Sequence, residues 1–159
     1  MASWQEVTEE AQELAAAVKE IFDAHRHKVL ATLRKDGSPR ISGTEVIFAF
    51  GDLWLGGMWR SKKALDLLRD PRFALHSATI DPDDNWPGDA KISGTVKEVQ
   101  DQEEKSAIRQ EIGEGPIGPF HLFRVNVHEM VLTRVGDPPD HLVIELWREG
   151  EGVRRFERK

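Results

Sequence analysis

Three cationic side chains and one hydroxyl occupy four consecutive positions, Arg60, Ser61, Lys62 and Lys63. They come between an expected strand and an expected helix, with Ser61 placed as the helix N-cap. The first backbone N–H groups of a helix have no intrahelical acceptor, and together with cations and a hydroxyl they can bind a phosphate. Cations in a first turn oppose the helix dipole when no anion is bound. The segment therefore predicts either an anion site or a solvated helix face.

A second basic cluster follows Trp147, and its cations are Arg148, Arg154, Arg155, Arg158 and Lys159. An aromatic ring among several arginines can bind a planar anionic ligand. The same cations are typical of an edge strand that is protected against pairing with another chain. The residues alone leave both interpretations open.

Histidines provide the other candidate chemistry. His25 and His27 could lie on one strand face as metal ligands, but there is no cysteine and no evident third ligand, so we expect no metal site. His76 falls in an expected strand and His128 between two of them, and both are interpreted as structural. We therefore assign no catalytic acid or base.

Composition excludes several classes of function. A net charge of −6 argues against a general nucleic-acid binder, which needs an excess of Lys and Arg. The lack of cysteine removes disulfides and thiolate chemistry and is consistent with a reducing cytoplasm. No apolar run approaches the roughly 20 residues that span a bilayer, and the acidic start of the chain is unlike a secretory signal. We expect a cytoplasmic protein without nucleic-acid or membrane partners.

Hydrophobic spacing predicts the elements that must position these residues. A capping box at Ser3 and Glu6 precedes a helix over residues 4–24, a short helix runs between Ser61 and Asp70, and a third over 102–112 follows Asp101. Alternation and turn residues predict strands at 28–33, 40–48, 53–58, 72–79, 90–99, 121–127, 130–135, 141–147 and 153–158.

The predicted elements form one domain over residues 1–159, with the N-terminal helix within 1–25 and a β-barrel over 28–158. The fold class is mostly β, or α+β by count, and the architecture is a small barrel with peripheral helices. Gly94 is a candidate β-bulge within the strand at 90–99.

Two motifs together resemble the pyridoxamine 5'-phosphate oxidase family. The first motif, similar to S-R-K-A…N-P-R-x-A-L, consists of Arg60 to Ala64, Leu67, Asp70 to Arg72, Ala74 and Leu75. The second, similar to W-x-x-G…R-x-x-x-R, consists of Trp147, Gly150, Gly152, Arg154 and Arg158. The resemblance implies the FMN-binding type of split β-barrel. The short D-G-S-P segment over 36–39 is more similar to the flavin/deazaflavin oxidoreductase branch.

The resemblance implies that the cofactor is flavin mononucleotide (FMN) or the deazaflavin F-420. Ser61, Lys62 and Lys63 match residues that hold the cofactor phosphate, and Arg60 lies beside them. The strand segment Ile41, Ser42, Gly43 and Thr44 matches the one that runs along the isoalloxazine edge, where its N–H groups and hydroxyls could meet charge that develops on reduction. Gly56 and Gly57 match the end of the next strand and leave room for a bulky ligand.

The resemblance also implies a homodimer with cofactor sites at the interface. Trp147 and Arg158 match residues that reach the cofactor from the partner subunit, and Arg154 matches a substrate-binding arginine. Phe156 replaces the histidine that the oxidase has two residues after that arginine, and the chain has no tyrosine. Val46 replaces a basic residue. These departures argue against pyridoxamine phosphate as the substrate.

Three functions follow as hypotheses. The first is a flavin- or deazaflavin-dependent oxidoreductase that transfers hydride to a small unsaturated substrate, with the redox chemistry supplied by the cofactor. The second is a non-catalytic cofactor- or haem-binding protein on the same fold, with His76 or His128 as the haem ligand. The third is a structural dimer without a cofactor.

Overall fold

The computed structural model describes residues 2–83, 85–114 and 118–159. The helices in this part of the chain are α1 (Trp4–Glu10), α2 (Gln12–Asp23), α3 (Lys62–Arg69) and α4 (Gln102–Glu111). The strands are β1 (Lys28–Leu33), β2 (Pro39–Thr44), β3 (Val46–Ala49), β4 (Asp52–Met58), β5 (Arg72–His76), β6 (Asp89–Glu98), β7 (Phe120–Val135), β8 (Leu142–Arg148) and β9 (Gly152–Arg158). The predicted mainly antiparallel β-fold with peripheral helices is confirmed.

The strands form one antiparallel sheet in the order β2-β1-β5-β6-β7-β4-β3, with the β8–β9 hairpin attached to β7. β2 and β3 follow one another in the chain but lie at the two ends of this order, so the sheet curls round on itself. A single strand was expected over 40–48. The structure divides it at Glu45, because its first part pairs with β1 and its second with β4.

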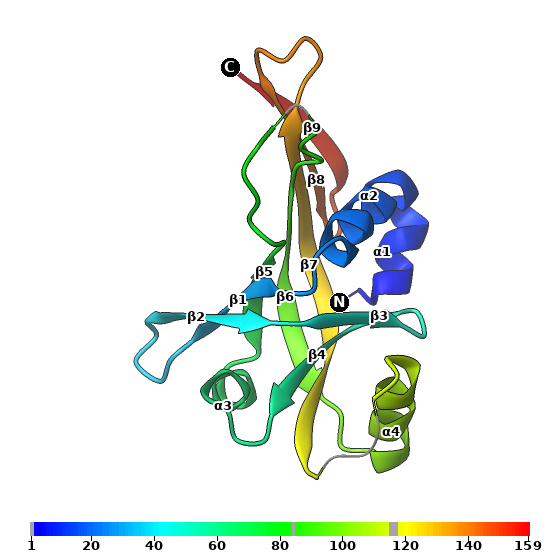
Figure 1. The fold of residues 1–159 in the computed structure, drawn as a ribbon, viewed down its shortest axis with the longest axis vertical. Coiled ribbons are helices and arrows are strands. Elements are labelled where there is room, and N and C mark those ends of the chain that lie inside the picture. The colour runs from blue at the N-terminus through cyan, green and yellow to red at the C-terminus, as the bar shows by residue number, and fades with distance from the viewer. Residues whose placement is uncertain (1, 84, 115–117) are drawn as a thin grey trace.

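β7 is the longest strand, and it connects the barrel to the β8–β9 hairpin. Its first residues pair with β4 and its last with β8, and β8 and β9 extend away from the barrel (Figure 1). Two strands, 121–127 and 130–135, were expected instead of one. The buried positions change phase between Val127 and Met130, and a bulge opposite Ser93 and Gly94 absorbs this change without ending the strand. Gly94 is needed there, because a Cβ would lie 2.0 Å from the Asn126 carbonyl oxygen.

The helix predicted over residues 4–24 is two helices. The chain bends at Ala11, whose φ of −137° and ψ of 58° are not helical. The bend lets both helices pack against the barrel beside β7 (Figure 1). The predicted capping box of Ser3 and Glu6 is confirmed, as are the N-caps at Ser61 and Asp101.

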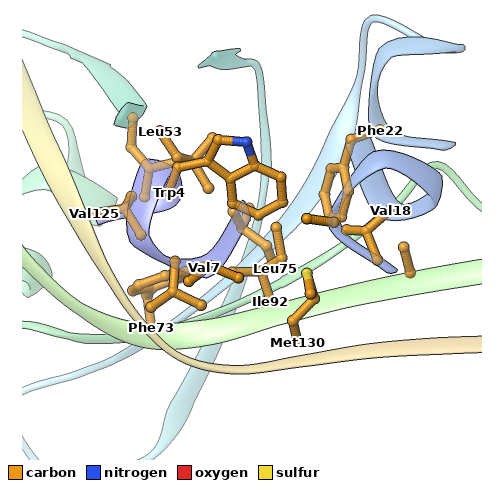
Figure 2. Close-up of a cluster of buried hydrophobic side chains, with 14 of the residues drawn as sticks. Trp4, Val7, Val18, Phe22, Leu53, Phe73, Leu75, Ile92, Val125 and Met130 are labelled. Atoms are coloured by element: carbon orange, nitrogen blue, oxygen red, sulfur yellow. The ribbon is translucent and has the colours of Figure 1, made fainter. Parts of the chain in front are cut away.

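The main hydrophobic core lies between α1, α2 and the inner face of the sheet (Figure 2). Trp4 and Phe22 project from the two helices, with Leu75, Ile92 and Met130 from the strands among their neighbours. A second cluster beneath α4 consists of Trp54, Val99, Ile108 and Leu122. This second cluster attaches α4 to β4 and β7, next to the site described below.

In the described part of the chain, none of the helices is both long and apolar enough to span a bilayer.

Candidate functional site

The predicted anion-binding residues gather at the start of α3. The turn from Met58 to Ser61 closes with the Ser61 N–H donating to the Met58 carbonyl at 3.0 Å. Ser61 Oγ then accepts from the Ala64 N–H at 3.4 Å, which caps the helix. Arg60 has a left-handed φ of 58° that non-glycine residues seldom adopt. The turn thus presents Arg60 and Lys62 to solvent, and neither makes an ion pair within the described residues.

Lys63 connects this helix to the strand that was expected to follow the cofactor ring. Its Nζ donates to the Gly43 carbonyl at 3.1 Å and lies 3.3 Å from Thr44 Oγ1. Burial lowers the pKa of the Lys63 ammonium below its usual value, and the Glu45 carboxylate acts in the opposite direction. The structure therefore brings two separately predicted sets of residues, in β2 and α3, into direct contact.

Gly56 and Gly57 lie at the end of β4, opposite the same turn. A Cβ at Gly57 would lie 3.3 Å from Ala64 Cβ and 3.5 Å from Ser61 Oγ, so a side chain there would push against the helix N-terminus. A Cβ at Gly56 would have nothing within 4 Å. The two glycines therefore allow α3 to approach closely and leave open space beside β4.

That open space belongs to a pocket of about 640 Å³. Gly56, Gly57 and Lys63 line one side of it, and Ile108 and Ile112 of the α4 region line another. The remaining lining residues are Arg26, Glu45, Val46, Ile47, Met58, Arg109, Glu114, Phe120 and Leu122. The lining therefore combines apolar side chains with several charged ones, a composition typical of small-molecule sites.

The α4 wall of the pocket was not predicted from the sequence. Phe120 is flanked by two cations, with Lys105 Nζ 4.5 Å and the Arg109 guanidinium carbon 4.8 Å from its ring centroid. Arg109 also forms an ion pair with Glu114 at 3.2 Å. These contacts join α4 to the start of β7, and they hold the apolar side chains of α4 over the pocket.

A buried carboxylate, also missed in the sequence, anchors α3 on the sheet. Asp66 accepts from Thr32 Oγ1 at 2.8 Å, from Arg40 Nε at 2.7 Å and from Arg69 at 2.8 Å. Burial alone would raise the pKa of Asp66, but the three donors outweigh it and hold the pKa below its ordinary value of 3.8. The ionised carboxylate therefore holds α3 against β1 and β2.

The strand expected beside the ring divides its side chains between two faces. Thr44 is buried toward α3, whereas Ile41 is 75% exposed and lies on the opposite face of the sheet. Ser42 shares the face of Thr44 and is half-buried. Gly43 shares the face of Ile41, where a Cβ would have nothing within 4 Å. Only one of the two faces therefore looks toward α3.

The C-terminal residues lie away from this pocket in the same chain. Arg154 and Arg158 are in β9, the outermost strand of the hairpin at the far end of the molecule from α3 (Figure 1). Trp147 has no exposed surface, and its Nε1 donates to Glu10 at 3.0 Å. Contact between this indole and a ligand would require its surroundings to open. A single chain does not bring these residues to the cluster at α3.

A histidine that sequence reasoning missed lies beneath the 58–61 turn. His121 Nδ1 is 2.9 Å from Glu98 Oε1, and the Trp59 ring stacks on the imidazole with a centroid separation of 4.6 Å. His121 Nε2 is buried and has no hydrogen-bond partner among the described residues. The one feature of the sequence that drew attention to this region was the aromatic Trp59 directly before Arg60.

The two histidines proposed above as haem ligands already have neighbours. His76 Nδ1 lies 2.6 Å from the Ser77 carbonyl oxygen, and its ring borders a smaller pocket of about 230 Å³ with Val29 and Ile41. His128 Nδ1 is 3.3 Å from Glu149. Of the two, only His76 lines a described pocket with apolar walls.

Comparison with known families gives one match over most of the chain. The family model of pyridoxamine 5'-phosphate oxidase matches residues 14–134. No curated protein matches.

Several solved structures share the fold. PhzG from Burkholderia lata, solved with tetrahydrophenazine-1-carboxylic acid, has a TM-score of 0.63 at 15% identity, covering 96% of this chain and 91% of that one. An F420 reductase has a TM-score of 0.53 at 18% identity, with coverage of 70% and 94%. HutZ, the heme storage protein from Vibrio cholerae, has a TM-score of 0.60 at 16% identity, with coverage of 72% and 90%. At these identities the likeness shows the fold alone.

Proposed function

The chain belongs to the pyridoxamine 5'-phosphate oxidase family, and from this we propose that it is an FMN- or F-420-dependent oxidoreductase. In this proposal it transfers hydride between the cofactor and a small unsaturated substrate. The observation that carries the proposal is the cationic N-terminus of helix α3, which adjoins a pocket lined by Gly56 and Gly57. The PhzG and F420 reductase folds give it further support.

The residues present suit a phosphate-bearing, ring-containing cofactor. Arg60 and Lys62 are exposed cations at the helix N-terminus, and the Ser61 hydroxyl retains a proton to donate while its oxygen caps the helix. Lys63 would hold a phosphate oxygen from the side of β2. The open space at Gly56 would admit a flat ring against bare backbone.

The cofactor would supply the hydride chemistry. The chain's own residues would bind its phosphate, orient its ring along β2 and exclude water with the apolar side chains of α4. Phe156 in place of a histidine, and a chain without tyrosine, favour a substrate other than pyridoxamine phosphate. The absence of cysteine is consistent with action in the cytoplasm.

We further propose that the active form is a homodimer. One face of the sheet carries exposed apolar side chains at Ile41 in β2, at Leu142 in β8 and at Phe156 in β9. The register places Arg154 and Arg158 on this same face. A partner packed there would bury the apolar residues, and it could bring its arginines to the first chain's cofactor site.

Titration of cofactor-free protein with FMN and with F-420, followed by ligand fluorescence, tests the proposal. Binding of either at micromolar affinity or better is expected, followed by turnover of enones or quinones above the rate of free reduced cofactor. If the protein binds neither FMN nor F-420, the proposal is wrong. Binding without turnover on a broad panel would leave a cofactor carrier.

Haem binding is the second candidate, and the HutZ fold together with His76 beside an apolar pocket favours it. Haem titration would then produce a Soret shift that His76→Ala abolishes and His128→Ala leaves in place. A wild-type spectrum equal to that of free haem would dismiss this function.

A further inference from the structure

The turn that presents the anion-binding residues rests on a stacked histidine. Met58 to Ser61 form this turn, and at its second position Trp59 lies with its ring nearly parallel to that of His121, at an interplanar angle of 9°. His121 is directly opposite Gly57 in the pairing of β4 with β7. The imidazole therefore lies beneath the turn and belongs to β7, the strand next to β4.

Glu98 fixes the orientation of that histidine. A carboxylate can only accept a hydrogen bond, so the 2.9 Å contact with Glu98 Oε1 places the proton on His121 Nδ1. Glu98 belongs to β6 and His121 to β7, so this bond spans two neighbouring strands. The imidazole also lies near the ring of Phe123, with centroids 6.1 Å apart. The ring is thus held at its edge by Glu98 and packs against two aromatic rings.

Stacking alone does not require a histidine. Phenylalanine would fill the same space without a polar atom, whereas His121 is only 3% exposed and leaves Nε2 without a partner among the described residues. Buried polar atoms without partners are uncommon, because they lose their hydrogen bonds to water on folding. What histidine adds is the directional bond to Glu98, which sets the ring plane that Trp59 meets.

The residue after Trp59 has the least favourable backbone conformation of the turn. Arg60 has a φ of 58°, and a left-handed conformation persists for such a residue only when its surroundings hold it. Trp59 is 53% exposed, so His121 supports the inner face of a ring that is otherwise open to solvent. Among the ring contacts of the described residues, this stack is the one that involves the 58–61 turn.

We propose that His121, fixed by Glu98 and stacked on Trp59, is a positioning residue that holds the 58–61 turn in its anion-binding conformation. The proposal rests on the phosphate site of the proposed function and assigns that site a support which makes no contact with the ligand itself. Loss of the support would let Arg60 leave its left-handed conformation, and the cation and the Ser61 hydroxyl would no longer point at one anion.

Comparison of FMN with riboflavin isolates this effect, because riboflavin has the same ring and lacks the phosphate. His121→Ala is expected to weaken FMN binding at least fivefold and to leave riboflavin binding within twofold. His121→Phe, which keeps a ring under Trp59 but loses the bond to Glu98, should recover only part of the loss. His141→Ala is the matched control, because His141 also contacts a carboxylate, at 2.8 Å, but lies in the β7–β8 connection. If the wild type binds F-420 instead, the same comparison is made with F-420 and its phosphate-free deazaflavin.

Equal weakening of FMN and riboflavin in His121→Ala, or no weakening of either, would overturn the inference. A measurement on the cofactor-free protein tests the positioning role of His121 independently of the proposed function. The contribution of Trp59 to the near-ultraviolet circular dichroism is the difference between the spectra with and without Trp59→Phe. This contribution should collapse in His121→Ala and return only in part in His121→Phe. If the wild type binds neither cofactor, the proposed function fails, and an unchanged Trp59 signal in His121→Ala would then overturn the positioning role as well.

Discussion

At the scale of single residues, neighbouring cations at the start of α3 differ in their exposure and their contacts. Lys62 is exposed and makes no ion pair within the described part of the chain, whereas Lys63 is half-buried and bonds to Gly43 and Thr44 of β2. A positive charge in the first turn is unfavourable without an anion, because it faces the positive end of the helix dipole. We therefore expect Lys62 to contribute only when an anion is bound, whereas the contacts of Lys63 with β2 form without one.

The double substitution Lys62→Ala with Lys63→Ala is expected to weaken FMN binding at least tenfold, because a charge-assisted bond contributes about 1.5–3 kcal/mol. Fluorescence titration measures the loss. Lys62→Ala alone should keep the melting temperature of the wild type, and Lys63→Ala alone should lower it. Exposed Lys97 on β6 provides the control, and unchanged affinity in the double variant would show that the phosphate lies elsewhere.

At the scale of elements, α3 is attached to the sheet by a carboxylate as well as by apolar packing. Ala64 and Leu67 are buried, and Asp66 lies between them with donors from β1, β2 and its own helix. Removing one member of such a buried network leaves the others without partners, which is costlier than never having formed it. The position of the α3 N-terminus, the proposed anion site, thus depends on Asp66.

Asp66→Asn is expected to lower the free energy of unfolding by about 3 kcal/mol at pH 7. The carboxyl of Asp66 has a pKa below 3.8 in the folded chain, so its contribution is complete above that value and is lost as the pH falls through the folded pKa. Urea unfolding of wild type and variant at pH 7 and pH 3 measures this. The difference between them should shrink at pH 3, and an equal difference at both values would contradict the assignment.

At the scale of the whole molecule, the two faces of the sheet are covered differently, with α4 packed on the second face at β4 and the start of β7. α1, α2 and the main core lie on the first face, and the second carries Ile41, Leu142 and Phe156 exposed. Leu142 and Phe156 lie on adjacent strands, and apolar side chains exposed together are typical of an interface. The β8–β9 hairpin extends this second face well beyond the barrel (Figure 1), which enlarges the surface that a partner could contact.

Phe156→Asp is expected to turn the proposed dimer into monomers and to weaken cofactor binding, because it places a charge in the apolar contact. Val153→Asp is the matched control, since Val153 is similarly exposed on β9 but faces the opposite side, paired with Trp147. Light scattering after gel filtration gives the mass of each variant. Monomeric wild-type protein, or dissociation by both substitutions alike, would rule out this face as the interface.

Local patterns were enough to predict many features of this protein. The caps at Ser3, Ser61 and Asp101, most strands and the bulge at Gly94 follow from neighbours a few residues apart. The motif over 60–75 was likewise visible, because its residues are contiguous. Boundaries failed where a long-range partner decided them, as at Ala11, at Glu45 and within β7.

The tertiary structure alone decided what surrounds the proposed anion site. Asp66 meets Thr32 across 34 positions, His121 meets Glu98 across 23, and α4 closes the pocket from a segment some 50 residues after β4 begins. Such contacts depend on sheet order and register, which no local spacing encodes, because any strand could pair with several others. Local propensity thus determined which elements form and where charges gather, and long-range pairing determined which of those charges share a site.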